Sequence, residues 1–369
     1  MDRSAMNTGA PYRYNHIQVE ITSRCNLRCR TCLYFYFEPQ WVPEDLSETA
    51  FRQLCGVAPA CRSIHLQGWG ESLLRNDCTA LIRRLAKEGT RVSVGTNGTI
   101  MNPDVAGALI RSGLDSMTFS IAGASADQQD PLRGRGSFDR AMQAVRIFSE
   151  ARGDGRKPPI VVNYLLTPDS LKSLHRAIIL CSRLGVDILH PTRMVHIATR
   201  FQEILADCQP TFVDRWAVFR ARLAVLWSGV TLTMPSLKKN LVPVCEKNPI
   251  ENLFVGADGS VSPCVYLNPP LNGSYPRIFG GQQWPSSRLV MGNLNRNRLD
   301  DIWNRQRYKQ FRKAFGDRLQ IYQQLMKGIT PDFEGMERLQ KTSDRLASLF
   351  TTRHQAPGPC RICPHLQGL

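Results

Sequence analysis

Residues 17–32 read IQVEITSRCNLRCRTC and place three cysteines directly after an apolar, strand-like run. The cysteines are Cys25, Cys29 and Cys32, in the spacing C-x₃-C-x₂-C. Iron–sulfur clusters are held by cysteine thiolates, and a four-iron cluster normally takes four of them. Three thiolates leave one iron with an open coordination position, where chemistry can take place. The stretch therefore predicts a reactive iron–sulfur site in the loop after a strand.

The chain around this loop repeats a strand–helix unit from residue 16 to about residue 195. Short apolar runs bounded by turn signals alternate with longer stretches that have helical spacing. The predicted strands are 16–22, 63–67, 91–96, 116–121, 160–166 and 187–190, with helices near 46–55, 77–88, 103–112, 137–151 and 170–184. Six such units with right-handed crossovers predict an α/β fold, a partial (β/α)6 TIM-like barrel.

The pattern changes in the last third of the chain. Residues 201–240 look helical and are expected to bridge two domains. Residues 253–263 predict a hairpin around an Asp-Gly turn, followed by a loop at 268–288 and helices near 298–315 and 317–352. We therefore expect a barrel at 14–200, a helical bridge at 201–240, and a small α+β domain at 241–369 with a helical insertion at 317–356.

Unusual residues gather where the predicted strands end. The segment 68–71, GWGE, follows the second strand, TNG at 96–98 ends the third, and Ser120 ends the fourth. Asn163 lies within the fifth. Because ligands of parallel α/β folds bind at the carboxyl ends of the strands, these residues and the cysteine loop predict a single active site at one rim.

The cysteine loop and the strand-end residues resemble the radical S-adenosylmethionine (radical SAM) superfamily. The resemblance implies that Cys25, Cys29 and Cys32 hold a [4Fe–4S] cluster whose fourth iron binds S-adenosylmethionine. It also implies an enzyme that cleaves S-adenosylmethionine reductively to a 5′-deoxyadenosyl radical, which abstracts hydrogen from a substrate. The cofactor carries this chemistry, while the protein orients the reactants and excludes water.

Further residues match the family by position. Segment 68–71 is similar to its Gly-Gly-Glu-Pro segment, although Ser72 replaces the proline, Thr31 replaces an aromatic residue before the third cysteine, and Ala122 replaces an acidic one. By this resemblance the cofactor-binding residues are Gly68, Gly70, Glu71, Asn97, Ser120, Arg133 and Asn163. The structural alternative for the cysteines is a zinc knuckle, but no fourth ligand lies close in sequence.

A second set of cysteines lies towards the C-terminus. Cys245, Cys264, Cys360 and Cys363 resemble the auxiliary-cluster region called SPASM or, in its shorter form, twitch. The full SPASM pattern has seven cysteines and two clusters, so four cysteines imply one further [4Fe–4S] cluster, fully ligated, that accepts or conducts electrons or supports the fold. A structural zinc ribbon is the alternative.

The composition of the chain indicates its cellular compartment and the kind of partner it binds. The 369 residues include 12 cysteines and carry a formal net charge of +16. There is no apolar run of membrane-spanning length and no signal peptide, so we expect a cytoplasmic protein with no membrane partner. Twelve cysteines in a reducing compartment favour metal binding over disulfides. The positive charge favours an acidic electron donor such as flavodoxin or ferredoxin, whereas nucleic acid is an unlikely partner because the basic residues are dispersed.

Three functions remain open from the sequence. The first is maturation of a peptide, protein or cofactor; the second is oxidation of a small alcohol such as an aminocyclitol; the third is a zinc-binding adaptor without enzymatic activity. The first strand begins by residue 16, so we expect no N-terminal leader-binding domain. No catalytic residue can be named, because oxidation needs a base that the motifs do not supply.

Overall fold

The computed structural model describes residues 12–207, 212–237, 240–329 and 333–368, which are built around one large sheet. Its strand order is β12-β9-β8-β1-β2-β3-β4-β5-β6-β7. The barrel strands, each parallel to its neighbour, are β1 (Tyr14–Val19), β2 (Cys61–Leu66), β3 (Arg91–Thr96), β4 (Ser116–Ile121), β5 (Ile160–Leu166), β6 (Ile188–Arg193) and β7 (Thr231–Leu232). The predicted partial barrel is confirmed.

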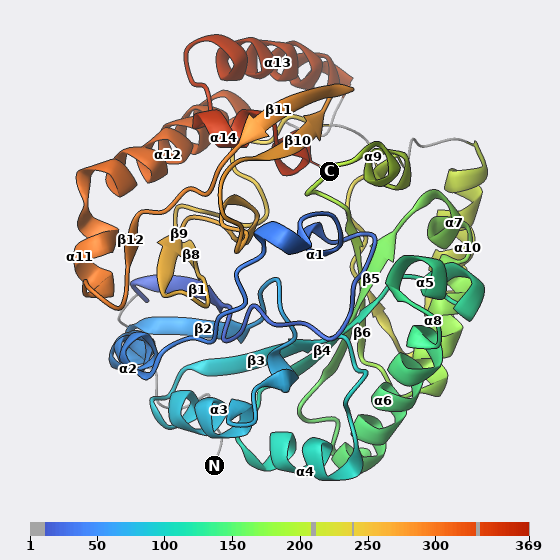
Figure 1. Ribbon diagram of the computed structural model, residues 1–369. Coiled ribbons are helices and arrows are strands. Elements are labelled where there is room, and N and C mark those ends of the chain that lie inside the picture. The colour runs from blue at the N-terminus through green and yellow to red at the C-terminus, as the bar shows by residue number, and fades with distance from the viewer. Residues whose placement is uncertain (1–11, 208–211, 238–239, 330–332, 369) are drawn as a thin grey trace.

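Helices cover the outer face of this curved sheet (Figure 1). They are α2 (Glu48–Val57), α3 (Cys78–Lys87), α4 (Pro103–Arg111), α5 (Ala126–Arg133), α6 (Ser137–Arg152), α7 (Pro168–Lys172), α8 (Leu174–Arg183) and α10 (Phe212–Ser228). Local sequence fixes where they begin: Asn102 accepts a hydrogen bond from the Val105 amide, and Pro103 starts α4. Ser47 caps α2 in the same way, through the Ala50 amide.

The strands separate an apolar outer layer from a polar interior. Ile17, Val19, Ile64 and Leu66 are fully buried against the helices. Since strand residues alternate between faces, residues such as His16 point to the other side, into the barrel. A closed barrel of this type is filled by layers of bulky apolar side chains, whereas this open barrel keeps a polar interior cavity.

The C-terminal region extends the sheet beyond β1. β8 (Asn252–Val255) pairs parallel with β1, and β9 (Ser260–Ser262) pairs antiparallel with β8, which confirms the predicted hairpin. β12 (Gly292–Asn293) completes this edge. The pairing of β8 with β1 was not predicted, and it joins the C-terminal region directly to the strand that precedes the first cysteines.

The loop predicted at 268–288 is wrong, because this segment contains a second hairpin. β10 (Tyr275–Phe279) and β11 (Gln282–Ser286) pair antiparallel. Gly280 and Gly281 form the turn with φ of 62° and 76°, a conformation that glycine adopts without strain and that suits a two-residue hairpin. The two adjacent glycines were the available signal.

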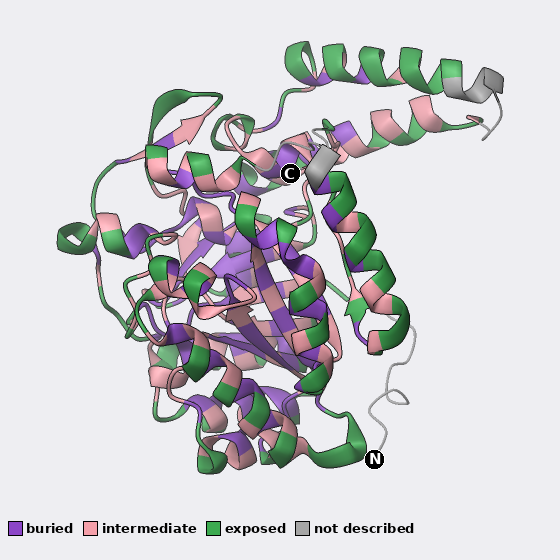
Figure 2. Ribbon diagram, turned by 90° about the vertical axis from the view of Figure 1, so that its right-hand side faces the viewer, coloured by how far each residue is buried: buried purple, intermediate pink, exposed green. Residues whose placement is uncertain are grey.

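Helices α11 (Leu299–Asn304), α12 (Gln306–Met326), α13 (Phe333–Thr352) and α14 (Gly358–Arg361) complete the C-terminal region. The break predicted at residue 316 does not occur, and α12 continues to Met326, shortly before Gly328 with φ of 80°. Figure 2 shows α12 and α13 at the top, reaching away from the barrel.

The segment between the two regions contains α9 (Arg200–Ala206) and α10, and α10 packs against α7 and α8. β7 then adds to β6 through Thr231 and Leu232. We retain the division at 14–200, 201–240 and 241–369 as a proposal, with the insertion at 317–356 now resolved into the end of α12 and α13.

Candidate active site

A cavity of about 140 Å³ lies where the first four strands end. Its walls contain Cys25, Cys29 and Cys32 together with the predicted residues Gly70, Glu71, Asn97, Ser120 and Arg133. Gly68 is not part of the wall, and Asn163 lines a different cavity deeper in the barrel. The structure therefore brings together eight of the ten residues that the sequence assigned to the first cluster and its ligand.

The cysteine loop is held by side chains around it. Arg28 donates to Glu38 at 2.7 Å and to the backbone oxygen of Cys25 at 2.9 Å, and its guanidinium lies over the Tyr34 ring. Trp41 stacks on Tyr34 and donates from Nε1 to the Ser23 oxygen at 2.9 Å. These contacts fix the loop without using the cysteine side chains.

The two glycines of segment 68–71 allow this segment to pack against the strand that leads into the cysteines. A Cβ atom on Gly68 would overlap the side chain of Glu20. A Cβ on Gly70 would overlap the backbone oxygen of Thr22 and would lie 2.7 Å from that of Arg24. Glycine at position 70 thus allows a close approach to the protein's own backbone, and glycine at position 68 a close approach to the Glu20 side chain.

The buried side chains of Glu71 and Glu20 join the segment 68–71 to neighbouring parts of the chain. Glu71 accepts hydrogen bonds from Thr96 Oγ1 and the Asn97 amide, both at 2.6 Å, so it joins the loop after β2 to the end of β3. Glu20 accepts from the amides of Trp69 at 2.6 Å and Ala257 at 3.2 Å. Burial raises the pKa of Glu71, and it raises the pKa of Glu20 to about 7 despite these bonds.

The thiols of the first set need a metal centre to be deprotonated. Burial raises the pKa of Cys25 to about 11 and that of Cys32 to about 12, so positively charged irons must stabilise the thiolates that bind them. In the described part of the chain, no three His, Cys, Asp or Glu side chains come close enough to share one metal ion. The three thiols line one cavity, and cysteine thiolates are the ligands of iron–sulfur clusters.

The four cysteines of the second set line a small apolar cavity. Cys245, Cys264, Cys360 and Cys363 all line it, with apolar neighbours that include Phe311. Burial raises the pKa of Cys264 to about 12 and that of Cys360 well above its usual range. Four thiols facing one apolar space fit a fully ligated cluster.

Arg318 of α12 joins the segments that carry these cysteines. Its buried guanidinium donates at 2.9 Å to the backbone oxygens of Pro243 and Val242, just before Cys245. It also donates at 2.8 Å to the oxygen of His354, which lies between α13 and Cys360. The helical insertion therefore supports the second set of cysteines.

A larger cavity of about 620 Å³ occupies the barrel between the two cysteine sets. It shares Gln67 with the first cavity and Cys264 with the second. Its wall is polar and includes His16, His65, Asn163 and His190. Burial lowers the pKa of His16 to about 4 and also lowers those of His65 and His190, so these imidazoles are neutral hydrogen-bonding groups at neutral pH.

Sequence reasoning missed four ionisable residues at one end of this cavity. Glu246, Lys247, Tyr266 and His365 line it, and each follows a cysteine of the second set by one or two positions. Glu246 lies 3.3 Å from Lys247 and 3.5 Å from His365. Their spacing from the cysteines was the available signal. Glu20 was also missed, although an acid within an apolar run next to the cysteine loop was visible.

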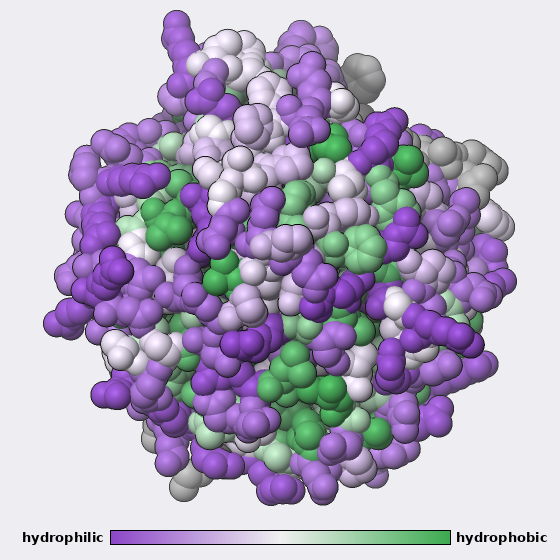
Figure 3. Space-filling view, in the orientation of Figure 1, coloured by the Kyte–Doolittle hydropathy of each residue, from purple (hydrophilic) through white to green (hydrophobic). Residues whose placement is uncertain are grey.

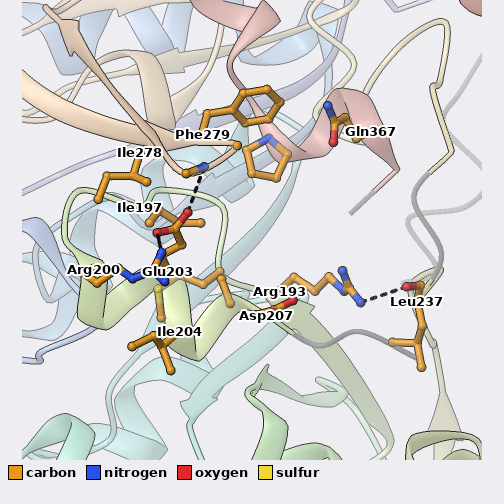
Figure 4. A pocket seen from close by; sticks show the side chains of 15 residues that line it. Arg193, Ile197, Arg200, Glu203, Ile204, Asp207, Leu237, Ile278, Phe279 and Gln367 are labelled. Carbon is orange, nitrogen blue, oxygen red and sulfur yellow. Dashed lines mark hydrogen bonds and ion pairs between the residues drawn. The ribbon is translucent and has the colours of Figure 1, made fainter. Parts of the chain in front are cut away.

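An outer pocket of about 470 Å³ opens beside the barrel cavity, with Arg193 in the walls of both. Figure 4 shows it between α9, the β10–β11 turn and the C-terminal segment. Glu203 of α9 accepts from the Gly281 amide at 3.2 Å and pairs with Arg200, while Arg193 donates to the Leu237 oxygen at 3.3 Å. Apolar side chains such as Ile278 complete a mixed polar and apolar surface.

Two family models match the chain over the regions just described. The radical SAM superfamily matches residues 19–181, which contain the first three cysteines. The iron–sulfur cluster-binding domain SPASM matches residues 245–324, which contain Cys245 and Cys264. The cofactors are therefore S-adenosylmethionine with its [4Fe–4S] cluster and an auxiliary iron–sulfur centre.

Two curated relatives match the chain over most of their own length. The chain is 24% identical, over 80% of its own length and 83% of the relative's, to a tungsten-containing aldehyde ferredoxin oxidoreductase cofactor-modifying protein of Pyrococcus furiosus. It is also 24% identical to an AdoMet-dependent heme synthase of Nitratidesulfovibrio vulgaris, over 79% and 80% of the two chains.

Solved structures share the fold at low identity. SuiB of Streptococcus suis bound to S-adenosylmethionine has a TM-score of 0.59 at 14% identity, covering 82% of this chain and 68% of SuiB. Native anSMEcpe with bound AdoMet has a TM-score of 0.59 at 13% identity, covering 91% of this chain and 99% of anSMEcpe. None of the helices that the structure describes is long and apolar enough to cross a membrane. The chain carries a radical SAM domain and a C-terminal SPASM iron–sulfur domain, which confirms the expected enzyme and removes the adaptor alternative.

Proposed function

We propose that this enzyme modifies a small polar molecule, a cofactor or cofactor precursor, within its barrel cavity. The observation that carries the proposal is the position of this cavity, which adjoins both sets of cysteines through Gln67 and Cys264. Its volume of about 620 Å³ lies in the range of small-molecule and cofactor sites. The relative from Pyrococcus furiosus, whose printed name describes cofactor modification, supports the same class.

The residues around the three cavities then have separate roles. Cys25, Cys29 and Cys32 would hold the first cluster, and Cys245, Cys264, Cys360 and Cys363 the auxiliary one. When bound, S-adenosylmethionine and its cluster supply a radical that abstracts hydrogen. Gly70, Asn97, Ser120 and Arg133 would face that ligand, with Gly68 and Glu71 fixing the loop behind it. Asn163 would contact the substrate, because it lines the larger cavity.

The polar wall selects for a hydroxylated or carboxylated ligand. Neutral imidazoles of His16 and His190 can donate or accept a hydrogen bond, and Lys247 adds a positive charge at the end next to Cys264. His16 and His190 each use Nδ1 for a neighbouring hydroxyl, of Ser63 and Thr233, so a purely apolar ligand would leave Nε2 of both rings without a partner, which is costly in a buried site. The cavity therefore favours a polar substrate over an apolar one.

A peptide or protein substrate is the second candidate. The outer pocket favours it, because this pocket opens next to the barrel cavity at Arg193 and is large enough for several side-chain atoms (Figure 4). A peptide would lie in the outer pocket and send one side chain into the barrel. We also propose a cytoplasmic location and an acidic electron donor such as flavodoxin or ferredoxin, which the cysteine usage and the net charge support.

The first experiment tests the assignment of the two sites. Anaerobically reconstituted enzyme should bind about eight irons, and dithionite should convert S-adenosylmethionine to 5′-deoxyadenosine. Cys25→Ala should abolish this cleavage and retain the auxiliary iron. Cys360→Ala should lose auxiliary iron and retain cleavage. Cleavage that survives Cys25→Ala would contradict the assignment of the first site.

The second experiment separates the two substrate classes. Cell extract is divided by filtration into a protein fraction and a small-molecule fraction, and each is added to the reduced enzyme. Cofactor modification predicts that the small-molecule fraction increases the formation of 5′-deoxyadenosine. Stimulation confined to the protein fraction, and lost after protease treatment, would favour the peptide candidate.

A further inference from the structure

Helix α10 carries its large apolar side chains on the outside. Its inward positions include the small residues Ala217 and Ala221, which are buried. Its outward positions carry an apolar stripe of Trp216, Phe219, Leu223, Leu226 and Trp227, and Trp227 is 84% and Leu226 70% exposed. A surface helix normally buries its apolar face against the core. The reversed arrangement indicates a surface that another molecule covers.

The surroundings of this stripe are strongly basic. Arg215, Arg220 and Arg222 are exposed on α10, and Arg176 and Arg183 on the neighbouring α8. Arg220 donates to His175 at 2.7 Å, which fixes its guanidinium on the face between the two helices. Neither helix exposes an acidic residue, because α8 contains none and the single acid of α10, Asp214, is buried.

We propose that this face of α8 and α10 is a docking surface for an acidic protein that offers apolar side chains between its carboxylates. The apolar stripe would form the buried centre of the interface, and the five arginines would pair with carboxylates around it. None of the stripe residues lines the three cavities of the active site. The surface is therefore separate from catalysis, and it lies on the outer side of the barrel that Figure 2 turns towards the viewer.

The residue types favour a protein over other occupants. Tryptophan, phenylalanine and arginine are enriched in protein interfaces, where lysine is depleted, and α8 and α10 contain no lysine. A second copy docked on the same face would bring like-charged arginines together without carboxylates, which is costly. Helices that lie on anionic membranes carry a broad lysine- and arginine-rich polar face opposite the embedded apolar face, whereas the face of α10 opposite its apolar stripe contains the buried Ala217 and Ala221 and packs on the barrel.

The test uses the full-length enzyme with a photoreactive phenylalanine analogue in place of Trp227. A matched variant carries the analogue at Trp284, an exposed tryptophan on the β10–β11 hairpin. Both are expressed in the native cells, irradiated and analysed by mass spectrometry. We expect a protein of net negative charge to be enriched at position 227 over position 284. That protein is then purified and its affinity for the enzyme measured by titration calorimetry.

In the titration, Leu223→Ser and Trp227→Ser should each weaken binding by about tenfold or more, and Arg222→Glu should weaken it as well. Trp284→Ser should leave the affinity unchanged, and added salt should reduce it. Cleavage of S-adenosylmethionine should stay at the wild-type rate in all four variants, which shows that they fold.

Several results would overturn the proposal. One is no enrichment at position 227, or a neutral or basic captured protein. Another is an affinity that Trp227→Ser does not change. Self-association in sedimentation experiments that Trp227→Ser abolishes would assign the face to a second copy. Sedimentation with phosphatidylglycerol vesicles that the same change abolishes would assign it to a membrane surface.

Discussion

Cys25, Cys29 and Cys32 lie on one loop of the barrel, whereas the auxiliary cysteines come from three segments spread over residues 245–363. The first set is held by neighbours close in sequence, such as Arg28 and Trp41. The second set depends on Arg318, which binds backbone oxygens 75 and 36 residues away. One site is thus built locally and the other by long-range packing.

This difference predicts that the two sites fail independently. A loop held by near neighbours such as Arg28 and Trp41 can keep its geometry when the distant helices α12 and α13 loosen, although Gln202 also donates to the Arg30 oxygen at 3.4 Å. Closing the long loops between distant segments lowers the conformational entropy of the chain, so a site assembled from such segments needs strong contacts between them. Variants that lose the auxiliary iron but keep cleavage of S-adenosylmethionine, or the reverse, test this difference between the two sites.

The largest effect is expected from Arg318→Met. The variant leaves the oxygens of Val242, Pro243 and His354 without their buried donor, at a cost of about 3 to 5 kcal/mol in the free energy of unfolding. We expect the auxiliary iron to be lost while cleavage of S-adenosylmethionine continues. Iron analysis and 5′-deoxyadenosine formation measure the two outcomes.

Arg345→Met is the matched control, since Arg345 is exposed on α13. It should keep both the full iron content and the wild-type stability. If Arg318→Met retained all its iron, the auxiliary site would not depend on the helical insertion. If it lost cleavage as well, the two sites would not be independent.

Gly70→Ala should damage the first site and leave the auxiliary site intact. The added methyl group would overlap the backbone oxygen of Thr22, so the segment 68–71 or the cysteine loop must move. We expect cleavage of S-adenosylmethionine to fall by at least about tenfold, since a small displacement of positioned groups slows a reaction strongly. The auxiliary iron should remain.

Gly56→Ala is the control for this change, because a methyl group at Gly56 of α2 meets no atom within 4 Å. Alanine is also the better helix former, by about 1 kcal/mol. This variant should be as active as the wild type and slightly more stable. Normal activity of Gly70→Ala would show that the close backbone approach is not needed for the first site.

The same contrast explains what the sequence could predict. The strands at 91–96, 116–121 and 160–166 were placed exactly where the structure has them, because their apolar runs are short and bounded by turns. The pairing of β8 with β1 could not be predicted, since nothing local in residues 252–255 specifies a parallel partner so far away. The β10–β11 hairpin was missed because β11 is mostly exposed and has no apolar pattern, while the segment around it is rich in Pro, Gly and Ser.

The candidate site divides in the same way. Residues on the loops after β1 to β4 could be predicted to meet, because parallel strands end at one rim. Arg318 could not be predicted, since a single arginine in a charged helix gives no sign that it is buried. Asn163 was assigned to S-adenosylmethionine by the family resemblance, but only the structure shows which of two adjoining cavities it lines.

The smallest effect concerns Glu20, which connects the two regions through the amides of Trp69 and Ala257. Its pKa is raised to about 7 by burial, above the value of 4.5 for an exposed glutamate. The native state then binds this proton more tightly than the unfolded state, so stability falls as the pH rises from about 4.5 to about 7. The loss over this range is at most about 3 kcal/mol. Urea denaturation at several pH values measures it.

Glu20→Gln removes the titration and should flatten this pH dependence, because the side chain can no longer lose a proton. Glu88→Gln, at an exposed position at the end of α3, should leave the slope unchanged. If Glu20→Gln kept the wild-type slope, another group would be responsible and Glu20 would be ionised throughout. If the pH dependence of stability disappeared and Trp69 became accessible to fluorescence quenchers, the carboxyl group of Glu20 would be what holds the loop of Trp69 next to Ala257 of the C-terminal region.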